Sequence, residues 1–202
     1  MNQVVLLDYQ QEFNNWRQAS PVTSRIKASW QDSDLAFAWQ LTVQTDEVPA
    51  DDAYDSWTTQ QKHFLRDLHL GWGFPHSSTE HYMAFDPPLT GPLSHVLDHF
   101  PSQCMTYTGL KLTPGHMLAW HFDTFAHFVH SSVIQESNMH RVWRSAMMLT
   151  DWNFGHVIQI GNQVISHWQR GDVFSWPCYT WHGTANFGAT DMIVLQVSYV
   201  HQ

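Results

Sequence analysis

Residues 115–123 read Gly-His-Met-Leu-Ala-Trp-His-Phe-Asp, a glycine turn followed by an apolar run that ends in a His-x-Asp pair. In an extended strand, residues i and i+2 point to the same side, so His121 and Asp123 can converge on one metal ion while Phe122 points away. His182 supplies a second imidazole from a distant part of the chain. Two imidazoles and one carboxylate can occupy one face of an ion and leave other positions open, as in non-haem iron sites that activate dioxygen.

A second segment, residues 171–186, carries this second histidine and reads Gly-Asp-Val-Phe-Ser-Trp-Pro-Cys-Tyr-Thr-Trp-His-Gly-Thr-Ala-Asn. Its opening Gly-Asp pair predicts a turn into a strand, which Pro177 ends before His182 opens the next strand. The chain has 15 histidines, far more than one metal site needs, so spacing and context must select the ligands. If His121 and His182 each bond one metal at about 2 Å, their imidazoles must lie within about 6 Å of each other.

The C-terminal half of the chain has the pattern of a β-barrel or β-sandwich, because short strand-like runs are separated by Gly, Pro, Asn and Asp. Gly161-Asn162 predicts a tight hairpin between two of these runs. The longer segment 125–139 predicts a loop over a cavity mouth that decides specificity. The predicted strands cover residues 105–112, 117–123, 142–149, 156–160, 164–168, 173–176, 182–185 and 192–200.

The N-terminal half has a mixed pattern, in which partial alternation indicates strands, and caps with flanking Gly or Pro mark helices. We predict one domain over 1–202, with strands and helices over 1–103 that buttress a β-barrel over 104–200. The predicted N-terminal elements are strands over 4–8 and 34–45 and helices over 58–70 and 92–100.

The charge of the chain excludes several classes of partner. The net charge is −9, and no run of Lys or Arg is present, so binding of nucleic acid through phosphate neutralisation is not expected. An acidic surface also disfavours anionic membrane surfaces, and no apolar run of 18 residues predicts a membrane span. We therefore expect no nucleic-acid partner and no membrane association.

The two cysteines, Cys104 and Cys178, match no zinc or redox motif. The first residues carry neither a basic flank nor a long apolar core, so we predict no signal peptide. Free thiols in the cytoplasm are the expected state, with a single disulfide left open. Oligomeric state and substrate identity are not predicted.

The two segments together resemble the two motifs of the cupin superfamily. Residues 171–186 have the form G-x5-P-x4-H-x3-N of the second motif, and residues 115–123 resemble the first with Asp123 in place of its second histidine. Residues 111–200 are most similar to the aspartyl/asparaginyl β-hydroxylase branch of the Fe(II)/2-oxoglutarate-dependent oxygenases. The matching pieces are Pro114-Gly115, His121, Arg144 with Gly155 eleven residues on, Ile160-Gly161-Asn162, Trp168-x-x-Gly171 and His182-x-x-x-Asn186.

The resemblance implies a mostly β fold, a double-stranded β-helix (jelly-roll, cupin-like) with flanking N-terminal helices. It implies that His121, Asp123 and His182 are the catalytic residues that hold Fe(II), and that Arg144 helps to hold 2-oxoglutarate as co-substrate. Dioxygen then takes part in hydroxylation of a peptide, an amino-acid derivative or another small organic substrate, with succinate and CO2 as the other products.

One position departs from the superfamily pattern. An Arg or Lys about ten residues after the distal histidine usually clamps the far carboxylate of 2-oxoglutarate as a charged pair. Met192 stands there in this chain, and no basic residue follows Arg170. The candidates for a replacement are Arg144, Arg141 and Lys111.

Three alternatives stay open. A cupin-type dioxygenase or isomerase uses the same metal without 2-oxoglutarate, and the absence of a basic residue at Met192 favours it. A non-catalytic metal-binding or small-ligand β-barrel results if Asp123 points away from His182. A zinc hydrolase also leaves one metal position open, but it needs a general base, for which Asp151 and Glu136 are the candidates.

Overall fold

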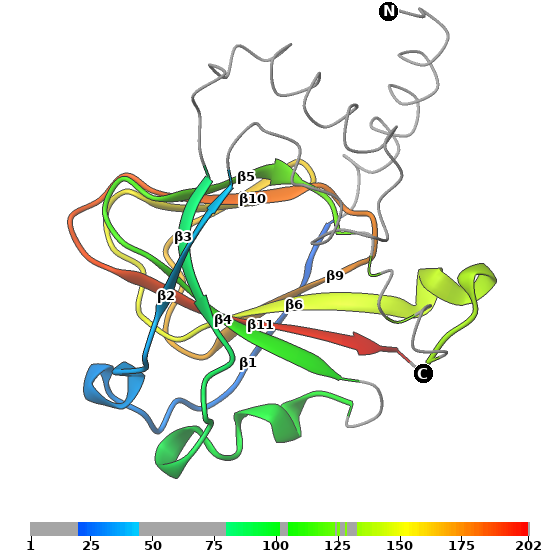
Figure 1. Cartoon of the computed structure of the whole chain (residues 1–202), viewed down its shortest axis with the longest axis horizontal. Coiled ribbons are helices and arrows are strands. Elements are labelled where there is room, and N and C mark those ends of the chain that lie inside the picture. Colours follow the sequence, from blue (N-terminus) through cyan, green and yellow to red (C-terminus); the bar gives the residue numbers. More distant parts are fainter. Residues whose placement is uncertain are drawn as a thin grey trace, which may run out of the picture.

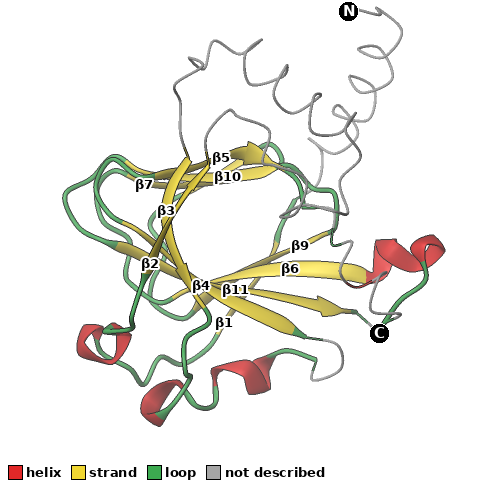
Figure 2. Cartoon of the chain, in the orientation of Figure 1, coloured by secondary structure: helices red, strands yellow, loops and turns green. Residues whose placement is uncertain are grey.

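The computed structural model is mostly β, as the sequence predicts, and the helical elements among the described residues are short 3-10 turns (Figure 2). No helix of the described residues combines the length and the apolar character needed to cross a bilayer. The structure describes residues 20–44, 80–101, 105–123, 125, 128 and 133–201.

All eight strands predicted for the C-terminal half are present. They are β4 (Thr106–Leu112), β5 (Met117–His121), β6 (Val142–Met148), β7 (His156–Ile160), β8 (Gln163–Ile165), β9 (Asp172–Pro177), β10 (His182–Asn186) and β11 (Met192–Val200). The strand β5 ends at His121, two residues earlier than predicted. The strand β8 is also shorter than predicted, because His167 adopts a positive φ of 60° that an extended strand does not allow. The predicted hairpin at Gly161-Asn162 is confirmed, since Ile160 pairs with Gln163.

The strand order defines a double-stranded β-helix. One group of strands pairs in the order β9-β6-β11-β4 and the other in the order β5-β10-β7-β8, all antiparallel. Successive strands along the chain mostly cross from one group to the other, which is the jelly-roll arrangement. Figure 1 shows β5 and β10 on one side of the barrel and β4, β6 and β11 on the other.

Among the described residues, three N-terminal strands extend this barrel. The strand β1 (Val22–Arg25) pairs with β9, and β2 (Gln40–Gln44) pairs with β3 (Glu80–Phe85). The strand β3 also pairs with both β4 and β5, so it joins the two groups along one side. Neither β1 nor β3 was predicted from the sequence.

Two N-terminal predictions are wrong in part. The predicted strand 34–45 begins as the 3-10 helix η1 (Asp32–Leu35), because the Asp34 carboxylate accepts a hydrogen bond from the backbone N–H of Gln31 and closes a turn. The predicted helix 92–100 is two 3-10 turns, η2 (Gly91–Leu93) and η3 (Val96–His99). The hydroxyl and backbone N–H of Ser94 both bond to the carbonyl of Gly91 and end the first turn. The predicted strand 4–8 and helix 58–70 lie outside the described residues.

The β6 and β11 strands are buried on both faces. Alternate residues such as Ala146, Met148 and Val194 face the barrel interior, a cluster to which both strand groups contribute. The residues between them, such as Met147 and Leu195, face a second cluster that Trp30, Leu93 and Phe100 cover from outside. Burial on both faces explains why the β11 sequence is almost continuously apolar.

Gly171→Ala is expected to lower the free energy of unfolding by on the order of 3 kcal/mol. Gly171 has a φ of +89°, and a Cβ there would lie 2.1 Å from the carbonyl oxygen of Ile26. Urea denaturation measures the loss. Gly115→Ala is the matched control, because Gly115 has a φ of +83° but a Cβ there would meet nothing within 4 Å. Equal losses in the two variants would contradict the steric argument.

Candidate metal centre

The neighbouring strands β5 and β10 bring the two predicted imidazoles together. His121 and His182 are direct cross-strand partners, and their ring centroids are 4.3 Å apart. Asp123 lies just beyond the end of β5, with its Oδ2 3.4 Å from Nε2 of His182 and its Oδ1 3.9 Å from Nε2 of His121. One ligand atom from each of the three residues lies within 4.8 Å of the other two. The distance condition set by the sequence is therefore met.

His182 has the properties of a metal ligand. Its Nδ1 is 2.9 Å from the carbonyl oxygen of Thr180, which can only accept, so Nδ1 carries the hydrogen and Nε2 carries a lone pair. The side chain is buried, and its Nε2 makes no hydrogen bond within the described part of the chain. Burial, reinforced by the nearby His121, lowers the pKa of His182 to about 3, so the ring stays neutral. A divalent transition metal fits this donor.

Asp123 is held as a carboxylate by a charged neighbour. Burial alone would raise its pKa, but Arg144 and the two imidazoles outweigh burial and lower the pKa to about 2. The Nε and Nη2 atoms of Arg144 each lie 3.0 Å from Oδ2 of Asp123. The Nη1 atom donates to Oε1 of Gln196 at 3.1 Å, and the guanidinium lies 4.9 Å from the ring centre of Phe125. The structure therefore places the predicted Arg144 directly beside the three candidate ligands.

The other two basic candidates lie elsewhere. The Nζ of Lys111 is 2.8 Å from Oδ2 of Asp191, and the residue alternates with Leu110 and Leu112, which face the barrel interior. Arg141 is exposed, and its Nε donates to the carbonyl of His201. Neither side chain is brought to the candidate metal centre, and Met192 is fully buried in the apolar interior.

Aromatic side chains pack around the candidate ligands, and a buried amide anchors the strand that carries His182. Phe122 points away from the centre, as predicted, and packs against the rings of Trp181 and Tyr179 at centroid distances of 5.1 and 6.2 Å. The Trp176 ring lies 4.9 Å from that of His182. Asn186, the last residue of the second motif, is fully buried. Its role is structural, because its Nδ2 donates to the carbonyls of Leu112 and Thr190 at 2.8 and 2.7 Å and anchors the far end of β10.

Sequence reasoning missed Gln196 as a neighbour of the site. A signal for it exists, because Gln196 and Ser198 interrupt the apolar β11 run at alternate positions, on the face that Met192 and Val194 share. In the 125–139 segment, the buried Phe125 packs within an apolar cluster, and the role of this segment as a lid stays a prediction.

Acid is expected to destabilise the metal-free protein at pH values well above those at which carboxylates usually become protonated. Between pH 6.5, the ordinary pKa of His182, and its folded pKa of about 3, the unfolded chain binds a proton that the folded chain does not. The free energy of unfolding therefore falls as pH falls through that range. Folding lowers the pKa of Asp123 from 3.8 to about 2. The contribution of Asp123 to stability is therefore lost as pH falls from 3.8 to about 2, in the same direction as that of His182.

Urea unfolding of the metal-free protein at about pH 7.5 and about pH 4.5 measures this dependence. The His182→Ala variant is the comparison, because it lacks the imidazole that stays neutral in the folded state. Its stability profile between these values should be flatter than that of the wild type. An unchanged slope would contradict the assignment of His182 as a buried neutral ring.

Comparisons with known proteins give similar structures but no sequence relative. No protein-family model matches the chain, and no curated protein matches it. The double-stranded β-helix is established by this chain's own strand order.

Three solved structures illustrate the likeness. KdgF from Halomonas sp. is 12% identical and has a TM-score of 0.37, with 60% of this chain and 80% of that chain covered. A predicted oxalate decarboxylase from Thermotoga maritima is 17% identical and has a TM-score of 0.36, with 59% and 81% covered. A cupin superfamily protein from Desulfitobacterium hafniense is 14% identical and has a TM-score of 0.33, with 50% and 72% covered.

Proposed function

We propose that this protein is a non-haem Fe(II)- and 2-oxoglutarate-dependent oxygenase that hydroxylates a peptide, an amino-acid derivative or another small organic substrate. The observation that supports it most directly is the convergence of His121, Asp123 and His182, with the buried Nε2 of His182 lacking a hydrogen-bond partner among the described residues. His121, Asp123 and His182 would hold the iron, and Arg144 would bind a carboxylate of the co-substrate. The bound iron would supply the activation of dioxygen.

The charge balance of the centre suits an anionic co-substrate. Asp123 carries one negative charge and Arg144 one positive charge, while metal-bound imidazoles are neutral. A divalent ion therefore leaves the group with two positive charges in a partly buried site. A dianionic 2-oxo acid such as 2-oxoglutarate would neutralise them, and neutral pairs are favoured where water is excluded.

Each residue around the centre has a task that follows from its contacts. Arg144 orients the Asp123 carboxylate through two donors and keeps it ionised at neutral pH. The carbonyl of Thr180 fixes the tautomer and orientation of His182, as outer partners of metal ligands commonly do. Phe125 beside Arg144 and Trp176 beside His182 contribute apolar surface that would exclude competing water.

Anaerobic addition of Fe(II) and 2-oxoglutarate to the metal-free protein tests the proposal. A weak visible charge-transfer band is expected when the 2-oxo acid binds the iron. In air, 2-oxoglutarate should be consumed and succinate formed. Protein that binds iron but shows no band and forms no succinate contradicts the use of 2-oxoglutarate.

One observation favours a second candidate, a cupin-type dioxygenase or isomerase that does not use 2-oxoglutarate. Met192 is fully buried where a basic residue is expected, and Lys111 pairs with Asp191 on the outer face of β4. The zinc-hydrolase alternative gains no support from Asp151, whose carboxylate accepts a hydrogen bond from the backbone N–H of Arg170. Iron binding without succinate formation is the result that would favour the second candidate.

A further inference from the structure

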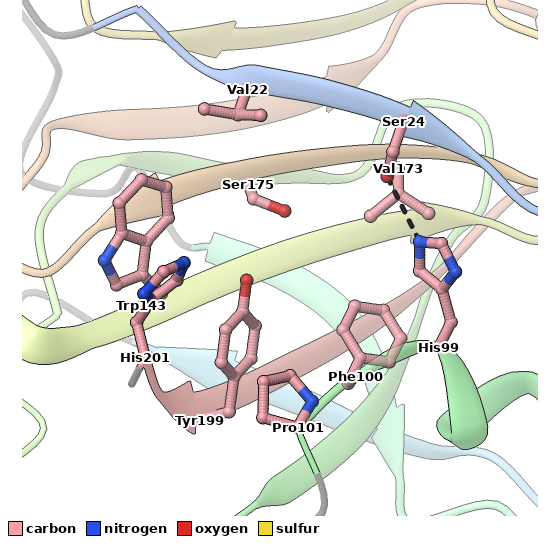
Figure 3. Close-up of a pocket in the computed structure, with 10 residues that line it drawn as sticks. All are labelled: Val22, Ser24, His99, Phe100, Pro101, Trp143, Val173, Ser175, Tyr199 and His201. Carbon is pink, nitrogen blue, oxygen red and sulfur yellow. Dashed lines mark hydrogen bonds between the residues drawn. The ribbon is translucent and has the colours of Figure 1, made fainter.

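A groove lies on the outer face of the barrel wall formed by β6, β9 and β11 (Figure 3). Trp143, Ser175 and Tyr199 form its floor. The Ser24 hydroxyl on β1 is hydrogen-bonded to Nε2 of His99 at 3.2 Å and closes one end. The groove has a volume of about 210 Å³. The neighbours of its floor residues along the strands, Arg144 and Trp176, face the opposite side, so the groove is separate from the candidate metal centre.

The groove has no acidic, Lys or Arg side chain but is rich in hydrogen-bonding groups. None of the residues that line it is Asp, Glu, Lys or Arg. Hydroxyls come from Ser24, Ser175 and Tyr199, and flat apolar surface comes from Trp143 and Phe100. The two imidazoles of the lining have contacts of their own, since Nε2 of His99 is bonded to the Ser24 hydroxyl and the His201 ring lies 5.3 Å from that of Trp143. No carboxylate, ammonium or guanidinium group is present to compensate the desolvation of a charged ligand. The lining suits a ligand with both apolar C–H faces and neutral hydroxyl groups.

One hydroxyl on the floor of the groove, that of Tyr199, has a hydrogen with no acceptor among the described residues. The Ser145 hydroxyl donates to the Tyr199 hydroxyl at 3.3 Å and is 2.6 Å from the Ser175 hydroxyl. Because the single hydroxyl hydrogen of Ser145 is donated to Tyr199, the hydroxyl of Ser175 donates to that of Ser145. The hydrogen of the Tyr199 hydroxyl then has no acceptor among the described residues, although the side chain is buried. Buried donors of this kind are normally satisfied, which indicates a missing partner in the groove.

We propose that this groove binds one uncharged, hydroxyl-rich ring, either a single sugar or a cyclic polyol. The Tyr199 hydroxyl would donate to a ring or hydroxyl oxygen, and the Trp143 indole would contact the apolar face of the ring. The volume of about 210 Å³ lies below the roughly 300–1,000 Å³ of sites for drug-sized ligands, so it suits a ligand no larger than a single ring. For a ligand this small we expect a dissociation constant on the order of 1 mM.

Nuclear magnetic resonance of the Trp indole N–H groups tests the proposal in the metal-free protein. The Trp143 signal is identified by its loss in Trp143→Phe. D-glucose, D-galactose and myo-inositol are the neutral probes, while sodium phosphate and cyclohexanol test a charged ligand and a ring with few hydroxyls. At least one neutral polyol should shift the Trp143 signal along a saturable curve. No shift with any of them, or shifts with phosphate or cyclohexanol alone, would overturn the proposal.

Two matched variants separate the specific contact from a general effect. Tyr199→Phe removes only the hydroxyl and should weaken polyol binding about five- to tenfold. Tyr107→Phe makes the same change in a residue packed against the same cluster but outside the groove lining, and it should bind as the wild type does. Thermal unfolding confirms that both variants are folded. Unchanged binding by Tyr199→Phe would overturn the role given to its hydroxyl.

Discussion

Replacing His182 with Ala is expected to weaken Fe(II) binding by more than about 100-fold, because even the outer partners of metal ligands cost about 10–100-fold when they are removed. His182 supplies the one nitrogen of the centre whose lone pair is shown to be buried without a hydrogen bond among the described residues. Anaerobic titration calorimetry with Fe(II), or with Mn(II) as an air-stable substitute, measures the affinity. Urea unfolding should be measured beside the affinity, since the variant loses the hydrogen bond to Thr180 and leaves a cavity, although it also removes an unsatisfied buried atom.

His156→Ala is the matched control for a buried histidine on a neighbouring strand. Its Nδ1 accepts from the backbone N–H of Asn153 at 3.3 Å, and its Nε2 donates to the carbonyl of Thr190 at 3.0 Å. Both nitrogens are thus used by the fold, so its removal should cost about 2–4 kcal/mol of stability and leave metal affinity unchanged. Equal effects of the two variants on metal affinity would contradict the assignment of His182 as a ligand.

The contrast between these histidines shows what the sequence could and could not predict. A His-x-Asp pair after a glycine turn is a local pattern, and strand geometry alone puts both side chains on one side. That His121 pairs directly with His182 depends on the register of β5 against β10, which only the folded barrel sets. The second motif indicated the position of His182 only indirectly, through the spacing of its turn, its proline and Asn186.

The direction of basic side chains was harder to predict. Lys111 and Arg144 both lie in strands, yet one faces the outer side and the other the barrel interior. Because the sheet of β4, β6 and β11 is buried on both faces, polar alternation does not mark which side is inside. The N-terminal strands β1 and β3 escaped prediction because their pairing with β9, β4 and β5 is long-range.

Arg144→Gln is expected to raise the KM for 2-oxoglutarate by about 10- to 100-fold, the cost of losing a charge-assisted contact with a carboxylate of the co-substrate and the guanidinium that orients Asp123. Its guanidinium is the cation that the structure places beside His182 and Asp123, with Gln196 and Phe125 holding it from the other side. Succinate formation at varied 2-oxoglutarate concentration measures KM. Arg144→Lys should recover only part of the loss, because an ammonium keeps the charge but not the planar fork.

Lys111→Gln is the charge-matched control, because it also removes one positive charge from a barrel strand. Its Nζ is paired with Asp191 on the outer face, where a partly exposed ion pair contributes about 0–1 kcal/mol. We therefore expect the KM of this variant for 2-oxoglutarate to stay within about twofold of the wild-type value, since salt screens a partly exposed charge that lies away from the centre. If Lys111→Gln raises KM and Arg144→Gln does not, Lys111 rather than Arg144 recognises the carboxylate of 2-oxoglutarate. If the wild type itself forms no succinate while His182 still governs iron binding, the centre works without 2-oxoglutarate.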